Sequence, residues 1–131
     1  MPEGLATQRG SIRVLLIDDR VTLSRAISKT LGEQYQVIPA QTGAEARRKL
    51  HHFRPDLIVL ELMLPDIDGL LLMIQLKAQT DAAIVVCTTR DDLVDRALCR
   101  RLGAVDFIAK PIKMSELKVR LAAAASLHAQ Q

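Results

Sequence analysis

Five polar residues follow short apolar runs of the sequence and are of types that bind metal ions and phosphate. Asp18 and Asp19 come directly after one run, and Glu61, Thr88 and Lys110 each follow another. Carboxylates placed together repel one another unless a positive charge joins them, and hard oxygen ligands of this kind favour Mg²⁺ that keeps several waters. A lysine and a hydroxyl nearby suit phosphoryl oxygens. The set predicts a site for magnesium and a phosphoryl group, provided that the fold gathers its members.

The apolar runs are predicted to be strands. Most lack polar alternation, as in Val14-Leu15-Leu16-Ile17, which is typical of parallel strands that are covered by helices on both faces. The predicted strands are residues 12–17, 35–38, 57–60, 83–87 and 105–108.

Segments with helical spacing of apolar residues separate these runs. The first ends before Gly32, a suitable C-terminal cap, and the second opens with the capping-box spacing of Thr42 and Glu45 and stops before Pro55. The predicted helices cover about residues 23–31, 42–54, 70–79, 92–102 and 114–129.

Strands that alternate with helices through short loops predict an open parallel sheet, and right-handed crossovers place helices on both of its faces. We predict one α/β domain over residues 12–129, a flavodoxin-like (βα)5 doubly wound sandwich with strand order 2-1-3-4-5. Residues 1–11 mix glycine, proline and polar residues without a period and are predicted to be a flexible leader. In such sheets ligands bind outside the carboxyl ends of the strands, where the five polar residues would meet. Taken singly, these residues have ordinary explanations, such as a helix cap for the Asp-Asp pair.

The composition excludes several classes of protein. The 131 residues, 49% of them hydrophobic, suit one packed core, and no apolar stretch approaches the ~20 residues of a membrane-spanning helix. The start of the chain lacks a secretory signal, so we expect a cytoplasmic protein with no membrane partner. A net charge of +3 with 2% aromatic residues gives little basis for direct binding of nucleic acid. Cys87 and Cys99 have no ligand-like spacing and are expected to be reduced packing residues.

Four segments resemble the receiver domains of bacterial two-component response regulators, and the resemblance extends over residues 12–129. It implies phosphorelay signal transduction by a module that is not an enzyme. The segments occur in the family's order and approximate spacing, and they are residues 14–19 (VLLIDD), 56–60 (DLIVL), 64–69 (LPDIDG) and 103–111 (GAVDFIAKP).

The resemblance implies roles for the polar residues at the strand ends. By the family pattern, Asp18 and Asp19 bind Mg²⁺ together with the backbone carbonyl of Met63 and the acidic side chain at Glu61. Glu61 stands at the position of the phosphoacceptor, which in the family is an aspartate. We therefore expect Mg²⁺ binding to be weakened.

Other roles concern the response to phosphate. Thr88 and Phe107 correspond to the switch pair, Lys110 to the contact with the phosphoryl group, and Pro111 to a proline that follows a cis peptide bond. Thr89 departs from the pattern, since receivers generally have a small residue there, and its branched side chain is expected to crowd the phosphoryl pocket.

The extra methylene of Glu61 changes the chemistry of the acceptor. It moves the carboxylate outward by about 1.5 Å, and a misplacement of ~1 Å can cost on the order of 10²-fold in an aligned displacement. Three hypotheses remain open. In the first, Glu61 mimics a phosphoryl oxygen and holds the switch partly in its active state. In the second, Glu61 pairs with Lys110 and the domain is a fixed interaction module. In the third, either Glu61 or Asp19 still accepts phosphate slowly. A phosphatase of the haloacid dehalogenase type is disfavoured, because Arg20 stands where a second aspartate is expected.

The partner surface is predicted on the last third of the chain. A solvated charged face is the ordinary explanation for its basic residues. The resemblance offers a docking face instead, formed by residues 92–102, 105–108 and 114–129, for a homodimer, a histidine kinase, another protein or a fused output domain. Asp106 and Arg120 are predicted to pair across such a dimer. The remaining residues of this face are Arg96, Arg100, Arg101, Lys113 and Lys118.

Overall fold

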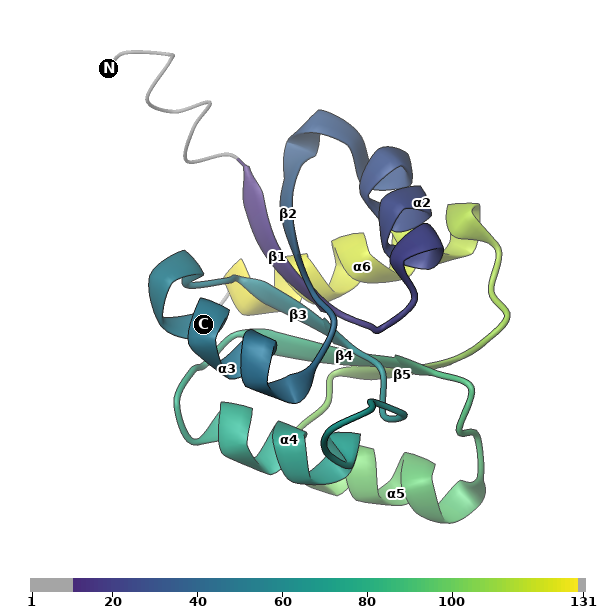
Figure 1. The fold of residues 1–131 in the computed structure, drawn as a ribbon. Helices are drawn as coiled ribbons and strands as arrows, with labels where there is room; N and C mark the ends of the chain where they lie inside the picture. Colours follow the sequence, from purple (N-terminus) through teal and green to yellow (C-terminus); the bar gives the residue numbers. More distant parts are fainter. Residues whose placement is uncertain (1–10, 130–131) are drawn as a thin grey trace.

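The computed structural model describes residues 11–129 (Figure 1). The predicted leader over residues 1–11 therefore lies outside the described residues, except for Ser11. In chain order the elements are β1 (Ile12–Ile17), α2 (Val21–Leu31), the 3₁₀ turn η1 (Gly32–Gln34), β2 (Tyr35–Ala40), α3 (Gly43–Phe53), β3 (Leu57–Leu60), α4 (Gly69–Lys77), β4 (Ala83–Thr88), α5 (Leu93–Arg101), β5 (Asp106–Ala109) and α6 (Met114–Ala129).

The five strands are parallel and form one sheet in the order β2-β1-β3-β4-β5. Helices α3, α4 and α5 cover one face of the sheet, and α2 and α6 cover the other (Figure 1). This arrangement confirms the predicted flavodoxin-like, doubly wound fold.

Strand β1 explains why its sequence lacks polar alternation. Leu15 and Ile17 pack into the apolar cluster beneath α3, α4 and α5, whereas Val14 and Leu16 pack into the cluster beneath α2 and α6. Successive side chains of a strand point to opposite faces, and here both faces are covered. Each residue therefore has to be apolar.

The observed bounds differ from the predicted ones by a few residues. Strand β2 continues through Pro39 to Ala40, which is tolerated because β2 is an edge strand and the missing N–H of proline leaves no interior hydrogen bond unmade. Helix α5 begins one residue later than predicted, because Asp92 lies outside the helix as its N-cap and accepts a hydrogen bond from the Asp95 N–H. The Thr42 side chain caps α3 in the predicted way.

The two cysteines are free and buried, as predicted. Burial raises the thiol pKa of both Cys87 and Cys99 to about 11, which keeps them protonated near neutral pH. No helix between residues 11 and 129 is long and apolar enough to cross a membrane.

Candidate functional site

Four of the five polar residues singled out by their position lie together at the carboxyl edge of the sheet. Asp18 follows β1, Glu61 follows β3, Thr88 ends β4 and Lys110 follows β5. These four strands are consecutive neighbours in the sheet, so their ends meet at one edge. Asp18, Glu61 and Thr88 are buried there, whereas the side chain of Asp19 is exposed.

Lys110 bridges the two buried carboxylates. Its Nζ lies 2.5 Å from Asp18 Oδ2 and 2.9 Å from Glu61 Oε1, and its side chain is only 7% exposed. Burial alone lowers the pKa of Lys110, but the hydrogen bonds to the two carboxylates raise it above its ordinary value. The ammonium group is therefore charged and balances the acidic groups around it.

Glu61 uses its second carboxylate oxygen for two further contacts. Glu61 Oε2 accepts hydrogen bonds from the Thr88 hydroxyl and from the backbone N–H of Met63, the latter at 3.0 Å. Burial alone raises the pKa of Glu61, but Thr88, Lys110 and the Met63 N–H together hold it below its ordinary value. Glu61 is thus an ionised carboxylate with hydrogen-bond donors on both oxygens.

Arg90 connects this site to the start of two helices. Its backbone N–H donates to Thr88 Oγ1 at 3.0 Å, while its guanidinium group binds Asp95 in α5 through Nε and Nη2, at 2.9 and 3.0 Å. Its Nη1 lies 2.8 Å from Asp68 Oδ2, and Asp68 caps α4. Sequence reasoning missed Arg90. The available signal was its position two residues after Thr88 and just before the acidic start of α5.

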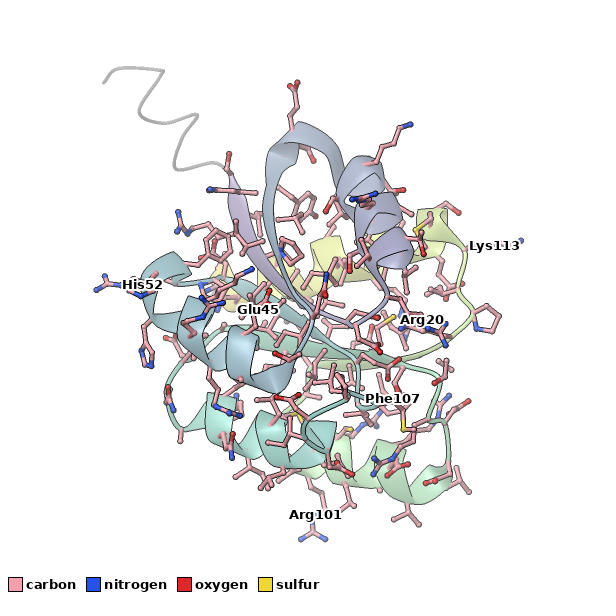
Figure 2. The ribbon with its side chains drawn as sticks, in the orientation of Figure 1. Arg20, Glu45, His52, Arg101, Phe107 and Lys113 are labelled. Atoms are coloured by element: carbon pink, nitrogen blue, oxygen red, sulfur yellow. The ribbon has the colours of Figure 1, made fainter. Side chains whose placement is uncertain are left out.

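Phe107 is buried on the face of the sheet that also carries Thr88. It pairs with Val86 in the register of β4 and β5, two residues before Thr88, and the Arg96 guanidinium carbon lies 4.9 Å from its ring centroid. Figure 2 shows its side chain in the interior, behind the ribbon. The predicted switch residue is thus packed inward and covered by an arginine of α5.

Asp106 and Arg120, predicted to pair across a dimer, are paired within the chain. Arg120 Nη2 lies 2.6 Å from Asp106 Oδ1 and also donates to the Phe107 carbonyl at 3.1 Å. A pair between subunits would have to replace these contacts. The other residues predicted for this face are exposed, namely Arg96, Arg100, Arg101, Lys113 and Lys118.

The peptide bond between Lys110 and Pro111 is cis, as the resemblance implied. Thr89 is exposed at the end of β4, in contrast to the buried Thr88 before it. Thr89 contributes, with Cys87 and Lys110, to the lining of a cavity of about 230 Å³ between α2 and α6.

The predicted magnesium ligands do not form a metal-binding group in this arrangement. Asp18 Oδ1 accepts from the Arg20 N–H at 2.9 Å and Oδ2 from Lys110, so all four carboxylate oxygens of Asp18 and Glu61 have donors. Over residues 11–129 no three acidic, histidine or cysteine side chains are placed to hold a metal ion. In this arrangement Lys110 lies between the carboxylates of Asp18 and Glu61. Binding of Mg²⁺ by Asp18, Asp19, Glu61 and Met63 stays a prediction.

The sheet is parallel and of (βα)5 type, and its carboxyl edge carries two buried acids, a threonine and a lysine. This combination is that of a receiver-type signalling domain. The family model for the response regulator receiver domain matches residues 14–122, and the chain belongs to that family. It is therefore the receiver domain of a two-component response regulator.

Individual relatives agree with this assignment. The transcriptional regulatory protein KdpE of Mycobacterium tuberculosis is 38% identical over 112 residues, which cover 85% of this chain and 50% of KdpE. The DNA-binding response regulator MtrA of Mycolicibacterium paratuberculosis is 36% identical with the same coverage of both chains. A solved receiver domain of a putative Luxo repressor protein from Vibrio parahaemolyticus superposes with a TM-score of 0.86 at 25% identity, covering 92% of this chain and 94% of that chain. The chain spans about half the length of these two curated relatives.

Proposed function

We propose that this receiver domain signals without phosphoryl transfer, and that the Glu61 carboxylate is a permanent internal ligand of Thr88 and Lys110. One observation carries the proposal: Glu61 binds the Thr88 hydroxyl with one oxygen and Lys110 Nζ with the other, at 2.9 Å. The family pattern assigns these same two side chains to the phosphoryl group. In this domain a carboxylate that is always present makes both contacts.

The length of the glutamate side chain accounts for the double contact. An aspartate at position 61 would end about 1.5 Å earlier, one C–C bond short of the present carboxylate. Its charge also matters, because a phosphoryl group carries ~1.5 to 2 negative charges and a carboxylate carries one. The Glu61 carboxylate therefore engages the switch threonine, but more weakly than a phosphoryl group would.

The same contacts oppose phosphorylation of Glu61. Attack on a phosphodonor needs a carboxylate lone pair that points in line, and hydrogen bonds to both oxygens of Glu61 make these oxygens weaker nucleophiles. The extra methylene adds a misplacement that is worth on the order of 10²-fold in rate. Slow phosphorylation of Glu61 or Asp19, the third hypothesis, is therefore an outcome that the experiment below has to test. Lys110 supplies the positive charge of the site, so the proposed resting state needs no bound magnesium.

The names of two relatives support a proposal for what this receiver domain controls. KdpE is called a transcriptional regulatory protein and MtrA a DNA-binding response regulator, and each is about twice as long as the matched region. We infer that this receiver domain controls a fused output domain or a separate protein in the cytoplasm by protein contacts. We do not expect the receiver domain itself to bind nucleic acid directly.

The first test is intact mass after incubation with Mg²⁺ and acetyl phosphate, with the native chain compared with Glu61→Asp and Glu61→Gln. We expect only Glu61→Asp to gain the mass of one phosphoryl group, because its shorter carboxylate is freed from Thr88. A phosphorylated native chain would contradict the proposal. If none of the three is modified, the pocket itself is incompetent, and Glu61 is not the reason for the absence of transfer.

A second test asks whether Glu61 engages the switch. The NMR chemical shifts of Phe107 and of the Thr88 amide are recorded for the native chain, for Glu61→Asp, and for Glu61→Asp with beryllofluoride and Mg²⁺. We expect the native shifts to lie toward those of the beryllofluoride complex. Native shifts that coincide with those of unliganded Glu61→Asp would instead favour a fixed scaffold. Thr88→Val should abolish the difference and Thr88→Ser should retain it, since only serine keeps the hydroxyl.

A further inference from the structure

The cavity of about 230 Å³ between α2 and α6 is large enough to hold a small organic molecule. Protein interiors are close-packed, and voids larger than a water molecule are few. An apolar cavity of about 150 Å³ can bind benzene, so this one has room for about eight to ten non-hydrogen atoms. We call it the α2–α6 cavity.

The mouth of the α2–α6 cavity lies at the carboxyl edge of the sheet. Arg20 follows β1, Thr89 follows β4 and Pro111 follows β5, and these three lining residues are exposed. Leu23 and Ile27 lie successively further from this edge along α2, by about 1.5 Å per residue. The cavity therefore extends from an exposed, polar mouth into the space between the two helices.

The floor of the cavity is apolar and buried. Ile27 of α2, Cys87 of β4 and Leu117 of α6 line it, and each is at most 2% exposed. The Cys87 thiol is uncharged near neutral pH, because burial raises its pKa to about 11. A polar group that reached this floor would lose its water without gaining a hydrogen-bond partner. The part of a ligand that lies here therefore has to be apolar.

The charged residues that line the cavity, Arg20 and Lys110, are both cationic. Lys110 Nζ is held by Asp18 and Glu61, at 2.5 and 2.9 Å, so its charge is already balanced. The Arg20 guanidinium group forms no salt bridge with any residue from 11 to 129. In Figure 2 the Arg20 side chain lies between the start of α2 and the segment that leads to α6. Arg20 thus places an unbalanced positive charge at the mouth.

The acids at the same sheet edge limit the charge that a ligand can carry. Asp18 and Asp19 follow β1 and Glu61 follows β3, so a doubly charged phosphate monoester would be repelled more strongly than a singly charged group. A carboxylate carries one negative charge, and its two oxygens match the two-pronged donor geometry of arginine. Thr89 supplies a hydroxyl at the same mouth. The mouth therefore favours a monocarboxylate.

We propose that the α2–α6 cavity binds a small monocarboxylate with an apolar body, namely an aromatic or aliphatic acid of about six to eight carbons. The carboxylate pairs with Arg20, and the apolar body lies against Ile27 and Leu117. An uncharged molecule of the same shape leaves Arg20 without a partner, and a cationic molecule meets a like charge. The site uses no phosphoryl chemistry at Glu61, so it is independent of the function proposed above.

The ligand class is tested with benzoate, benzyl alcohol and benzylamine, which share one ring and differ in charge, and with hexanoate as an aliphatic acid. Methyl NMR shifts of Leu23, Ile27 and Leu117 in the full chain are followed as each probe is added. We expect both acids to saturate one site and benzoate to bind at least about tenfold more tightly than the alcohol or the amine, since a hydrogen bond to a charged group is worth about that factor or more. Alcohol or amine binding as tight as that of benzoate would overturn the proposal, and so would a lack of saturable binding by both acids.

Variants at the mouth and in the cavity test the location of the site. Arg20→Met keeps an apolar stem at an exposed position, and we expect it to weaken benzoate binding at least about tenfold and to leave benzyl alcohol unaffected. Ile112→Trp fills the cavity at a half-buried position and should abolish binding of every probe. Arg25→Met, at an exposed arginine of α2 that does not line the cavity, is the matched control and should bind benzoate as the native chain does.

Three results of the variant series would overturn the assignment to this cavity. The first is benzoate binding by Arg20→Met that equals that of the native chain. The second is an equal loss for Arg20→Met and Arg25→Met, which would indicate a general effect of charge. The third is benzoate binding that survives Ile112→Trp, which would place the ligand elsewhere. Circular dichroism of each variant verifies that the fold is intact.

Discussion

The Thr88 hydroxyl donates a hydrogen bond to Glu61 Oε2, so a threonine that ends β4 is held by an acid that follows β3. The same hydroxyl accepts from the Arg90 N–H at 3.0 Å, and the Arg90 side chain binds the acidic residues at the start of α4 and α5. A change in the position of Thr88 is therefore transmitted to both helix N-termini by one residue. The geometry connects the acidic site to the surface that these helices present.

The pH dependence of stability should reflect the ionisation of Glu61. Burial alone would raise its pKa, but Thr88, Lys110 and the Met63 N–H hold the pKa below the ordinary value of 4.5. A lowered carboxyl pKa contributes stability that is present above the ordinary value and is lost as the pH falls through the folded-state pKa. We expect the native free energy of unfolding to fall more steeply below pH 4.5 than that of Glu61→Gln.

Urea unfolding followed by circular dichroism between neutral and acidic pH measures this difference. Asp66, Asp68 and Asp95 also have lowered pKa values, so both proteins lose stability in acid. The contribution of Glu61 is the part that differs between the two curves. Parallel curves would mean that Glu61 does not titrate in this way.

Replacing Lys110 by methionine should be strongly destabilising. The substitution leaves Asp18 and Glu61 buried without a counter-charge, and breaking a buried ion pair from one side costs about 3–5 kcal/mol. The double variant Lys110→Met/Glu61→Gln should recover part of this loss, since one buried charge is then removed. Urea unfolding at neutral pH provides the measurement, with Lys113→Met as the control at an exposed lysine. Equal losses for Lys110→Met and Lys113→Met would contradict the buried-pair argument.

Arg90→Lys should loosen the first turns of α4 and α5. Lysine cannot reproduce the two-point contact with Asp95 together with the contact to Asp68, and a lost hydrogen bond to a charged group is worth about 1.5–3 kcal/mol. Amide hydrogen exchange should become at least about tenfold faster in these turns and stay unchanged in α6. Arg100→Lys, at an exposed arginine of α5, is the control. Uniform acceleration throughout the chain would indicate a global loss of stability and not a local clamp.

Gly69→Ala should destabilise the fold because the backbone approaches this residue closely. A Cβ at Gly69 would lie 2.4 Å from Leu62 Cα and 2.9 Å from Leu62 O, so the backbone has to move. We expect a loss of about 3 kcal/mol, the upper part of the range for overpacking. Gly32→Ala is the comparison, since it has φ of +73° but nothing within 4 Å, and should lose only ~1 kcal/mol. Thermal unfolding separates the two, and a smaller loss for Gly69→Ala would refute the steric argument.

The fold followed largely from local patterns in the sequence. Continuous apolar runs such as Val14 to Ile17 and Leu57 to Leu60 are buried on both faces, and their alternation with helical segments was sufficient to predict a parallel sheet with helices on both sides. The strand order came with the flavodoxin-like fold assigned to that pattern. Errors were confined to the ends, as at Pro39, where the tolerance of an edge strand for proline depends on which strands are its neighbours.

The sequence by itself determined which residues meet at the carboxyl edge, because parallel strands all end on the same side. Only the tertiary structure decided what those residues do to one another. Lys110 contacts Asp18 and Glu61, which are 92 and 49 residues away along the chain, and it donates a hydrogen bond to one carboxylate oxygen of each. The tertiary structure also decided that Asp106 pairs with Arg120 within the chain. Such outcomes depend on side-chain reach and on competition among donors in three dimensions, which local periodicity does not encode.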